Sequence, residues 1–223
     1  MIDQIDEKPA LTLTKTVYEQ LRNDVLRGHL KPGQKLAAEA LRKRFNTGSS
    51  PVREALNRLL AEGFVALEEQ KGFRVSAVST DELRELVSAR CWIDGTAITE
   101  AIHRRETAWE EALVLALHRL TRTTRQSADG SENSEWESLH KAFHMELVRG
   151  CSNRWIIHTS EQLFDAAERY RLLAADHVSE RNELNEHKAI VDACLDHRAD
   201  LAVALIGGHY NQTFDAIVGT IKS

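Results

Sequence analysis

Four histidines carry the most distinctive chemistry in this 223-residue sequence. His140 and His144 are four residues apart, so on one helix their imidazoles share a face, one turn apart. His187 and His209 fall in two later helical segments and reach the same face if those helices pack antiparallel. Neutral imidazoles on a rigid scaffold suit a divalent transition metal such as Zn, Ni, Mn or Co. The competing interpretation is that each is an ordinary core or surface histidine.

Enzyme motifs are scarce around these histidines. Glu137 and His140 fit half of a di-iron bundle signature, but that chemistry needs a second Glu-x-x-His and two further glutamates, which the sequence does not offer on a suitable helix. There is no His-Glu-x-x-His, no Cys-x-x-Cys, no Gly-rich phosphate loop and no plausible serine triad. We therefore expect a protein that is not an enzyme. A helical-bundle metalloenzyme that uses the histidine cluster is the alternative.

Helical periodicity predicts the scaffold that positions the histidines. Apolar residues recur at helical spacing throughout residues 80–223, and no strand pattern appears there. The predicted helices span residues 81–106, 108–125, 132–150, 153–176, 179–196 and 199–221. Antiparallel helices of this length can enclose both a core and a cavity. We expect residues 80–223 to form a helical effector-binding and dimerisation domain.

Residues 1–79 have a different pattern, which is typical of a small mixed domain. Helices are predicted over residues 14–27, 37–45 and 51–62, and β-like runs over residues 64–67 and 73–75. Ser50 suits the N-cap of the third helix, and Pro51 suits its first position. This order describes a winged helix-turn-helix with a short N-terminal tail and a linker. The predicted fold class is mainly α: a winged helix-turn-helix with a small β-hairpin wing, then an all-α antiparallel bundle.

Charge divides the chain in the same way. The formal net charge is −5, yet residues 1–79 carry 13 basic and 10 acidic side chains, whereas residues 80–223 carry 16 and 24. A positive domain can approach a polyanion and a negative one will not compete for it. The asymmetry indicates two domains with different partners.

A winged helix-turn-helix places its third helix in the major groove of double-stranded DNA. Ser49, Ser50 and Arg53 would then meet the DNA backbone at the positive end of that helix. Lys71, Gly72 and Arg74 would form a wing tip near the minor groove. The alternative is a basic, solvated helix pair in a domain that binds nothing.

Three motifs in this domain resemble the DNA-binding domain of GntR-family transcription regulators. The resemblance covers residues 12–77 and rests on Ser50-Pro51-Val52-Arg53-Glu54-Ala55-Leu56, Glu62-Gly63-Phe64-Val65 and Lys71-Gly72-Phe73-Arg74-Val75. It implies that Arg53 and the Lys71-Gly72 wing contact operator DNA. The family usually has an arginine where Ser49 stands. The resemblance therefore implies that this contact is lost or moves to Arg42, Arg44 or Arg58.

The second half resembles the FCD effector domain of the FadR subfamily of these regulators, with greatest similarity to its CsiR-like branch. The resemblance covers residues 80–221 and rests on Arg90-x-x-Ile93-Asp94, His140-x-x-Phe143-His144, His187-x-x-Ile190 and His209. It implies a divalent metal held by an aspartate and three histidines, beside a small carboxylate. His140 occupies the aspartate's position, so either four histidines bind the metal or His140 does not. Asp94 stands where the family usually has a glutamate.

These resemblances imply a metabolite-responsive, DNA-binding repressor that its ligand releases. Zinc is the favoured metal, with Ni, Mn or Co as alternatives. A small carboxylate effector would bind the metal and pair with Arg90, beside Asp94, with Arg169 or Arg171 as alternative partners. Ordinary salt bridges are the competing role of these arginines. The effector would act through residues 76–81 and change the spacing of the two winged heads in a homodimer. A plain interaction module is the remaining alternative function.

The sequence also carries signals about its compartment. No run approaches 18 apolar residues, and the first ten residues lack the basic and apolar regions of a signal peptide. Three widely spaced cysteines disfavour a disulfide framework. We expect a cytoplasmic protein with no membrane partner.

Overall fold

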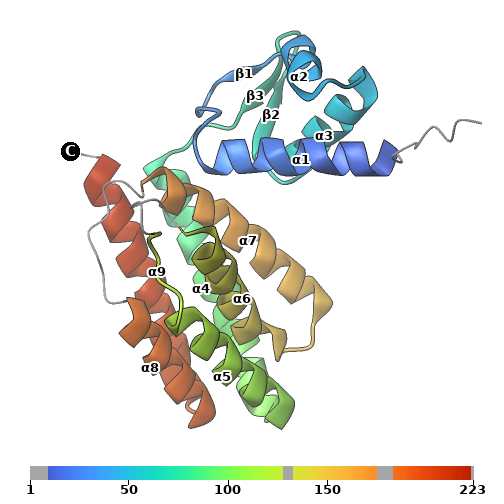
Figure 1. Cartoon of the computed structure of the whole chain (residues 1–223). Helices are drawn as coiled ribbons and strands as arrows, with labels where there is room; N and C mark the ends of the chain where they lie inside the picture. The colour runs from blue at the N-terminus through green and yellow to red at the C-terminus, as the bar shows by residue number, and fades with distance from the viewer. Residues whose placement is uncertain (1–9, 128–132, 175–182, 222–223) are drawn as a thin grey trace, which may run out of the picture. The chain divides into compact units, whose positions relative to one another are not determined.

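The computed structural model of the chain describes residues 10–127, 133–174 and 183–221 (Figure 1). Its contacts form two compact units: the chain up to Ser79 together with Glu168–Ala175, and the remainder from Thr80. The first unit ends at Ser79 and also takes in a later segment of the chain, which the sequence analysis did not predict. The roles assigned to the two domains stay a prediction at this point.

Three helices and a small sheet build the first unit. The helices are α1 (Ala10–Leu26), α2 (Ala38–Phe45) and α3 (Ser49–Ala61), and the strands are β1 (Lys35–Leu36), β2 (Val65–Glu68) and β3 (Gly72–Val75). The sheet is antiparallel with the order β1-β3-β2, and Val65 pairs with Val75 while Lys35 pairs with Arg74. The predicted winged helix-turn-helix is confirmed. Strand β1 was missed because two residues are too few to show alternation.

The core of this unit lies between α1, α3 and the sheet. Leu21 of α1 and Val52, Leu56 and Leu59 of α3 are fully buried. Their spacing on α3 puts them on one helical stripe that faces α1. Each buried leucine contributes about 1.5–3 kcal/mol to folding. The opposite face of α3 is thereby left to solvent.

The beginning of α3 differs from the prediction. The helix starts at Ser49, and Gly48 is the N-cap residue with an extended backbone and no side-chain cap hydrogen bond. Ser50 is therefore inside the helix rather than its cap, and Pro51 is its third residue. Pro51 is tolerated there because the first four N–H groups of a helix have no partner inside it.

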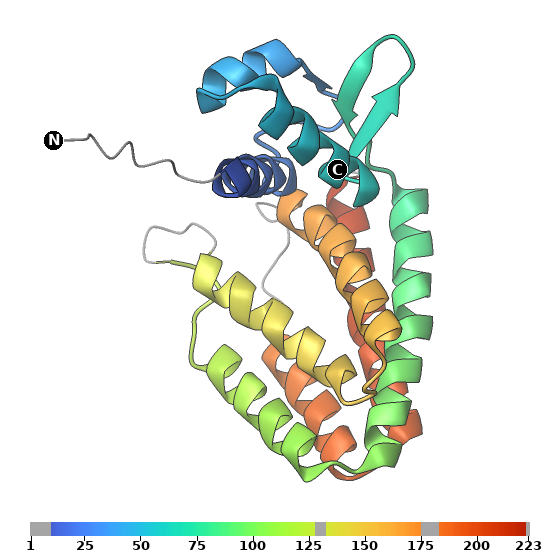
Figure 2. The same ribbon diagram turned by 90° about the vertical axis from the view of Figure 1, so that its right-hand side faces the viewer.

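Six further helices follow in the described residues, and Figures 1 and 2 show how they run beside one another. They are α4 (Thr80–Arg104), α5 (Thr107–Thr121), α6 (Ser134–Arg149), α7 (Arg154–Leu173), α8 (Glu183–Leu195) and α9 (Ala199–Ile221). Helix α4 packs on α6 and α9, α5 packs on α6 and α8, and α8 packs on α9. The predicted all-α bundle is confirmed.

Some predicted helix ends shift. Helix α5 ends at Thr121 rather than at residue 125, and α6 begins at Ser134, where the Asn133 side chain accepts the Glu135 N–H. Three other predicted helix limits lie outside the described residues: the starts at residues 132 and 179 and the end at residue 176.

Close packing fixes the far end of α6. Gly150 ends this helix, and a Cβ atom there would lie 2.7 Å from Ala101 and 2.8 Å from the Trp109 ring. Leu147 and Phe143, one and two turns earlier, are fully buried. Helix α6 is thus held firmly against α4 and α5. Among the described helices, none is long and apolar enough to cross a membrane.

Candidate metal centre and nucleic-acid interface

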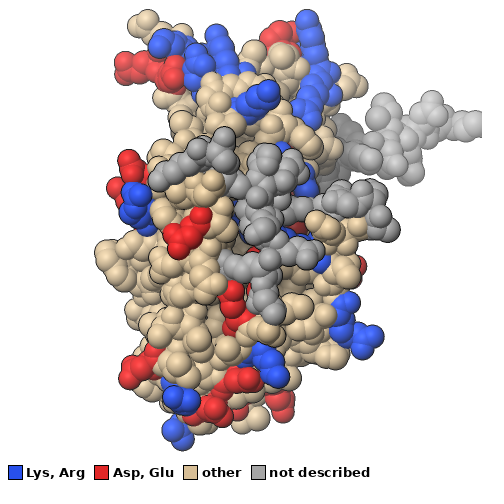
Figure 3. Space-filling view, turned by 90° about the vertical axis from the view of Figure 1, so that its left-hand side faces the viewer, with Lys and Arg blue, Asp and Glu red and all other residues tan. Residues whose placement is uncertain are grey.

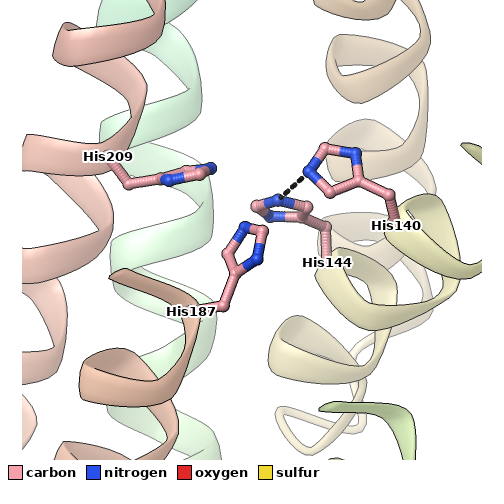
Figure 4. Close-up of side chains that lie close together, drawn as sticks. All are labelled: His140, His144, His187 and His209. Atoms are coloured by element: carbon pink, nitrogen blue, oxygen red, sulfur yellow. Dashed lines mark hydrogen bonds between the residues drawn. The ribbon is translucent and has the colours of Figure 1, made fainter. Parts of the chain in front are cut away.

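The four histidines of the sequence analysis converge inside the bundle (Figure 4). His140 and His144 come from α6, His187 from α8 and His209 from α9. One ring nitrogen of each lies within 4.8 Å of the corresponding atom of the others, and all four residues are buried. The structure therefore brings together a set of imidazoles from three helices that is suited to hold a metal ion.

Their electrostatics favour the metal-binding protonation state. Burial, followed by the neighbouring histidines, lowers the pKa of His144 well below 6.5. This imidazole is therefore neutral at pH 7 and keeps a lone pair. The Nε2 atoms of His140 and His144 are 3.1 Å apart, which brings two possible ligand atoms into direct contact.

Two residues that the sequence analysis missed orient the cluster. Glu186 Oε2 lies 2.8 Å from Nδ1 of His209, so the carboxylate holds the proton on Nδ1 and leaves the lone pair on Nε2. The Trp136 ring stacks on His140, with ring centroids 4.7 Å apart and planes at 11°. Their positions gave a signal, since Trp136 precedes His140 by one turn and Glu186 directly precedes His187.

Arg90 of α4 and His144 of the cluster lie near the same two aromatic rings, those of Phe164 and Tyr210. Its guanidinium carbon lies 3.8 Å from the centroid of the Tyr210 ring and 5.2 Å from that of Phe164, and the His144 ring is 5.4 Å from Phe164. Arg90 is only 7% exposed, and its buried Nε and Nη2 atoms have no hydrogen-bond partner among the described residues. A buried donor without a partner costs free energy that a ligand acceptor would recover.

Asp94, one turn after Arg90, has its own partners. The Ser160 hydroxyl donates to Oδ1 at 2.5 Å, and the Tyr210 hydroxyl donates to Oδ2 at 2.7 Å. Burial raises the pKa of Tyr210 well above 10, so its hydroxyl keeps its proton. The distance from Arg90 Nε to Asp94 Oδ2 is 3.7 Å, an ion pair without a hydrogen bond.

The two alternative arginines lie elsewhere. Arg169 and Arg171 belong to the segment of α7 that groups with the first unit. Arg169 donates to the carbonyl oxygen of Ser76, and Arg171 donates from Nε and Nη2 to both carboxylate oxygens of Glu168. Of the three arginines, Arg90 is the one in the same unit as the histidines.

On the first unit, α3 exposes the polar residues expected at a DNA groove. Ser49, Ser50 and Arg53 are all exposed at its N-terminal end. In the part of the chain that the structure describes, Arg53 has no ion pair or hydrogen bond. Its guanidinium is therefore available to an outside acceptor.

The other predicted arginines near this helix are paired. Arg42 lies 2.9 Å from Glu39, and Arg44 lies 2.6 Å from the nearly buried Asp24 of α1. Arg58 lies 3.3 Å from Glu62 and covers the ring of Tyr18 at 3.7 Å. Burial and the hydrogen bond to Glu62 raise the pKa of Tyr18 to about 12. These contacts join α1, α2 and α3.

The wing has a similar pairing. Arg74 lies 3.0 Å from Glu68 and donates to the carbonyl oxygen of Gly33, while Lys71 is 3.7 Å from Glu68. Gly72 has a positive φ of 83° with open space where a side chain would be, which lets the hairpin turn at its tip. Basic and acidic side chains are interspersed over this unit, at the top of Figure 3.

Comparison with known proteins gives the family. Residues 13–75 match the bacterial regulatory proteins of the gntR family, and residues 85–212 match the FCD domain. The HTH-type transcriptional repressor GlaR of Escherichia coli K12 is 37% identical over 158 residues, which cover 70% of this chain and 71% of that protein. The HTH-type transcriptional regulator BphR of Paraburkholderia xenovorans LB400 is 30% identical over 209 residues, covering 92% and 85%.

Solved structures have the same fold. Escherichia coli McbR/YncC superimposes with a TM-score of 0.74 at 18% identity, covering 93% of this chain and 97% of the other. A putative GntR regulator from Rhodococcus sp. RHA1 superimposes with a TM-score of 0.69 at 20% identity, covering 93% and 98%. The matched families are transcription regulators rather than enzymes. The chain belongs to the GntR family of bacterial transcription regulators and carries an FCD domain after its DNA-binding domain.

Proposed function

We propose that this regulator is a repressor whose operator binding is controlled by a small carboxylate, bound beside a divalent metal ion in the bundle. The observation that carries the proposal is Arg90, a buried guanidinium without a hydrogen-bond partner in the described residues, beside four buried histidines. The metal would supply an electropositive centre for one carboxylate oxygen. Arg90 would bind the carboxylate through its planar fork.

The donor set fits a metal ion. Zinc with Zn–N bonds of about 2.0–2.1 Å would separate neighbouring ligand nitrogens by about 3–3.5 Å, and it can expand to five ligands to accept the carboxylate oxygen. Nitrogens already within 4.8 Å of one another need only small side-chain movements to reach that spacing. Imidazole suits zinc, nickel and cobalt better than manganese, which prefers carboxylate oxygens. Zinc is therefore the proposed metal, held by His140, His144, His187 and His209.

Operator binding would use the exposed end of α3. In this type of domain that end enters the major groove, so Arg53, Ser49 and Ser50 would reach the DNA and the wing would reach the neighbouring minor groove. A homodimer would contact two half-sites, and the effector would favour an arrangement of the two heads that no longer fits both. Such coupling is worth about 1–3 kcal/mol. The name of the GlaR relative supports repression.

A metal assay tests the bundle directly. Purified wild-type protein, dialysed against zinc and then buffer, should retain one zinc per chain by X-ray fluorescence. His144→Ala should lose it, because this residue lies at the centre of the cluster. His158→Ala on α7 is the matched control, since His158 is exposed. Unchanged zinc content in His144→Ala would contradict the proposal.

Substitution of His140 separates the two possible ligand sets. His140→Ala should weaken zinc binding if four histidines hold the ion, whereas His140→Asp should restore it by providing a carboxylate oxygen.

Operator release by carboxylates is then measured by gel shift, on a DNA fragment that wild-type protein selects from a random pool. If no small carboxylate releases the zinc-loaded protein from this DNA, the effector part of the proposal is wrong.

A further inference from the structure

Arg90 and Asp94 lie four residues apart on α4, which is the spacing that normally lets an arginine and a carboxylate pair. A buried pair of this kind usually closes into two parallel N–H···O bonds. Here Nε of Arg90 lies 3.7 Å from Oδ2 of Asp94, which is too far for a hydrogen bond. The Nε and Nη2 atoms form one edge of the guanidinium, and both lack a hydrogen-bond partner in the described residues. That edge is the one that can bind a carboxylate at two points.

Two hydroxyl groups explain why Asp94 does not occupy this edge. Ser160 of α7 donates to one oxygen of Asp94 and Tyr210 of α9 donates to the other. Ser160 is fully buried and Tyr210 is 3% exposed, so water does not compete for these bonds. The Tyr210 ring also lies against the guanidinium at 3.8 Å and restrains its plane.

We propose that Ser160 and Tyr210 are positioning residues of the effector site: they hold both oxygens of Asp94, so that Arg90 keeps an open edge for the effector carboxylate. The inference rests on the proposed function, because it assumes that Arg90 binds the effector. Asp94 then has a role different from contact with the ligand. Its charge lowers the cost of burying Arg90 without consuming the donors of Arg90.

The first test is a set of variants that removes one hydroxyl at a time. The probe is acetate, titrated into zinc-loaded protein by calorimetry. Ser160→Ala and Tyr210→Phe should each weaken acetate binding about tenfold, because a released Asp94 oxygen closes on Arg90. Tyr210→Phe keeps the ring against Arg90, so it reports on the hydroxyl even if Ser160→Ala is poorly folded.

Asp94→Asn provides the decisive background. An uncharged amide has little tendency to capture Arg90, so adding Ser160→Ala to Asp94→Asn should change acetate affinity less than twofold. A purely structural role of Ser160 would weaken binding equally in both backgrounds, and that result would overturn the inference.

A second measurement is independent of the effector. The ¹⁵Nε–¹Hε NMR signal of Arg90 is identified by its loss in Arg90→Lys. Without acetate, this signal should move downfield in Ser160→Ala and in Tyr210→Phe. It should return to its wild-type position when Ser160→Ala is combined with Asp94→Asn. An unmoved signal in both single variants would overturn the positioning role. A signal that moves as expected in a protein that never binds acetate would support that role while contradicting the proposed function.

Discussion

The two units of the chain treat their arginines in opposite ways. On the winged-helix unit most arginines at the expected DNA surface are paired with carboxylates of the same unit, and one, Arg53, is exposed and unpaired among the described residues. In the bundle, Arg90 is buried and makes no hydrogen bond with the described residues. The paired arginines are Arg42, Arg44, Arg58 and Arg74.

This contrast shows that a guanidinium without a hydrogen-bond partner means different things in the two environments. Water solvates Arg53, so the missing partner costs almost nothing and carries little information alone. Arg90 has lost most of its water, so its missing partner costs free energy and itself points to a ligand. The argument for Arg53 instead depends on its place at the start of α3 in a GntR domain.

Removing the exposed cation should have the largest effect. Arg53→Ala should weaken binding to the selected operator by about tenfold to hundredfold, the loss expected for one arginine contact of about 1–3 kcal/mol. Fluorescence anisotropy with labelled DNA measures it. Arg42→Ala is the control, because Arg42 already pairs with Glu39, and it should change affinity less than threefold. Equal losses in the two variants would break the distinction between paired and unpaired arginines.

The buried cation should be sensitive to its shape as well as its charge. Arg90→Lys keeps the positive charge but loses the planar fork, so acetate affinity of the zinc-loaded protein should fall by about tenfold. Operator affinity without acetate should stay unchanged. Arg84→Lys on the same helix is the matched control, since Arg84 is exposed and pairs with Asp81. If Arg90→Lys binds acetate as tightly as wild type, Arg90 is not the carboxylate partner.

A packing change at the C-terminal end of α6, the helix that carries His140 and His144, should have a third, moderate effect on stability. Gly150→Ala would force a methyl group against Ala101 and Trp109, so the free energy of unfolding should fall by about 1–3 kcal/mol. Urea denaturation followed by circular dichroism measures the loss. Gly208→Ala on α9 is the control, because nothing lies within 4 Å of its added Cβ. A loss in Gly208→Ala as large as in Gly150→Ala would show that packing is not the cause.

The smallest effect should come from pH. His144 has a pKa well below 6.5 in the folded protein, so below pH 6.5 the unfolded chain binds a proton that the folded one does not. Stability of the metal-free protein should therefore fall as pH drops from 7.5 to 5.5, by about 1 kcal/mol for this group. Urea midpoints at the two pH values measure it. His144→Gln should show a smaller fall, and an identical fall would assign the pH dependence to other groups.

Local sequence patterns were enough for the helices, the winged fold and the face shared by His140 and His144, because each follows from spacing along one segment. The start of α3 was missed because Gly48, rather than a serine, is the N-cap residue. Contacts between distant segments were also beyond such patterns. Ser160 and Tyr210 reach Asp94 across 66 and 116 residues of sequence. The assignment of individual DNA contacts and metal ligands stays a prediction.

The stacking of Trp136 on His140 couples the intrinsic fluorescence of the protein to the histidine cluster. Trp92 and Trp155 are 73% and 69% exposed, so their emission is that of indole in water, whereas Trp136 is 4% exposed. Iodide in solution quenches the exposed pair first and leaves the blue emission of the buried rings. Any change in the electronic state of the His140 imidazole acts on the indole stacked against it at 4.7 Å. Zinc bound at His140, as proposed, would therefore change the emission of Trp136, and a zinc titration without any added dye should show it.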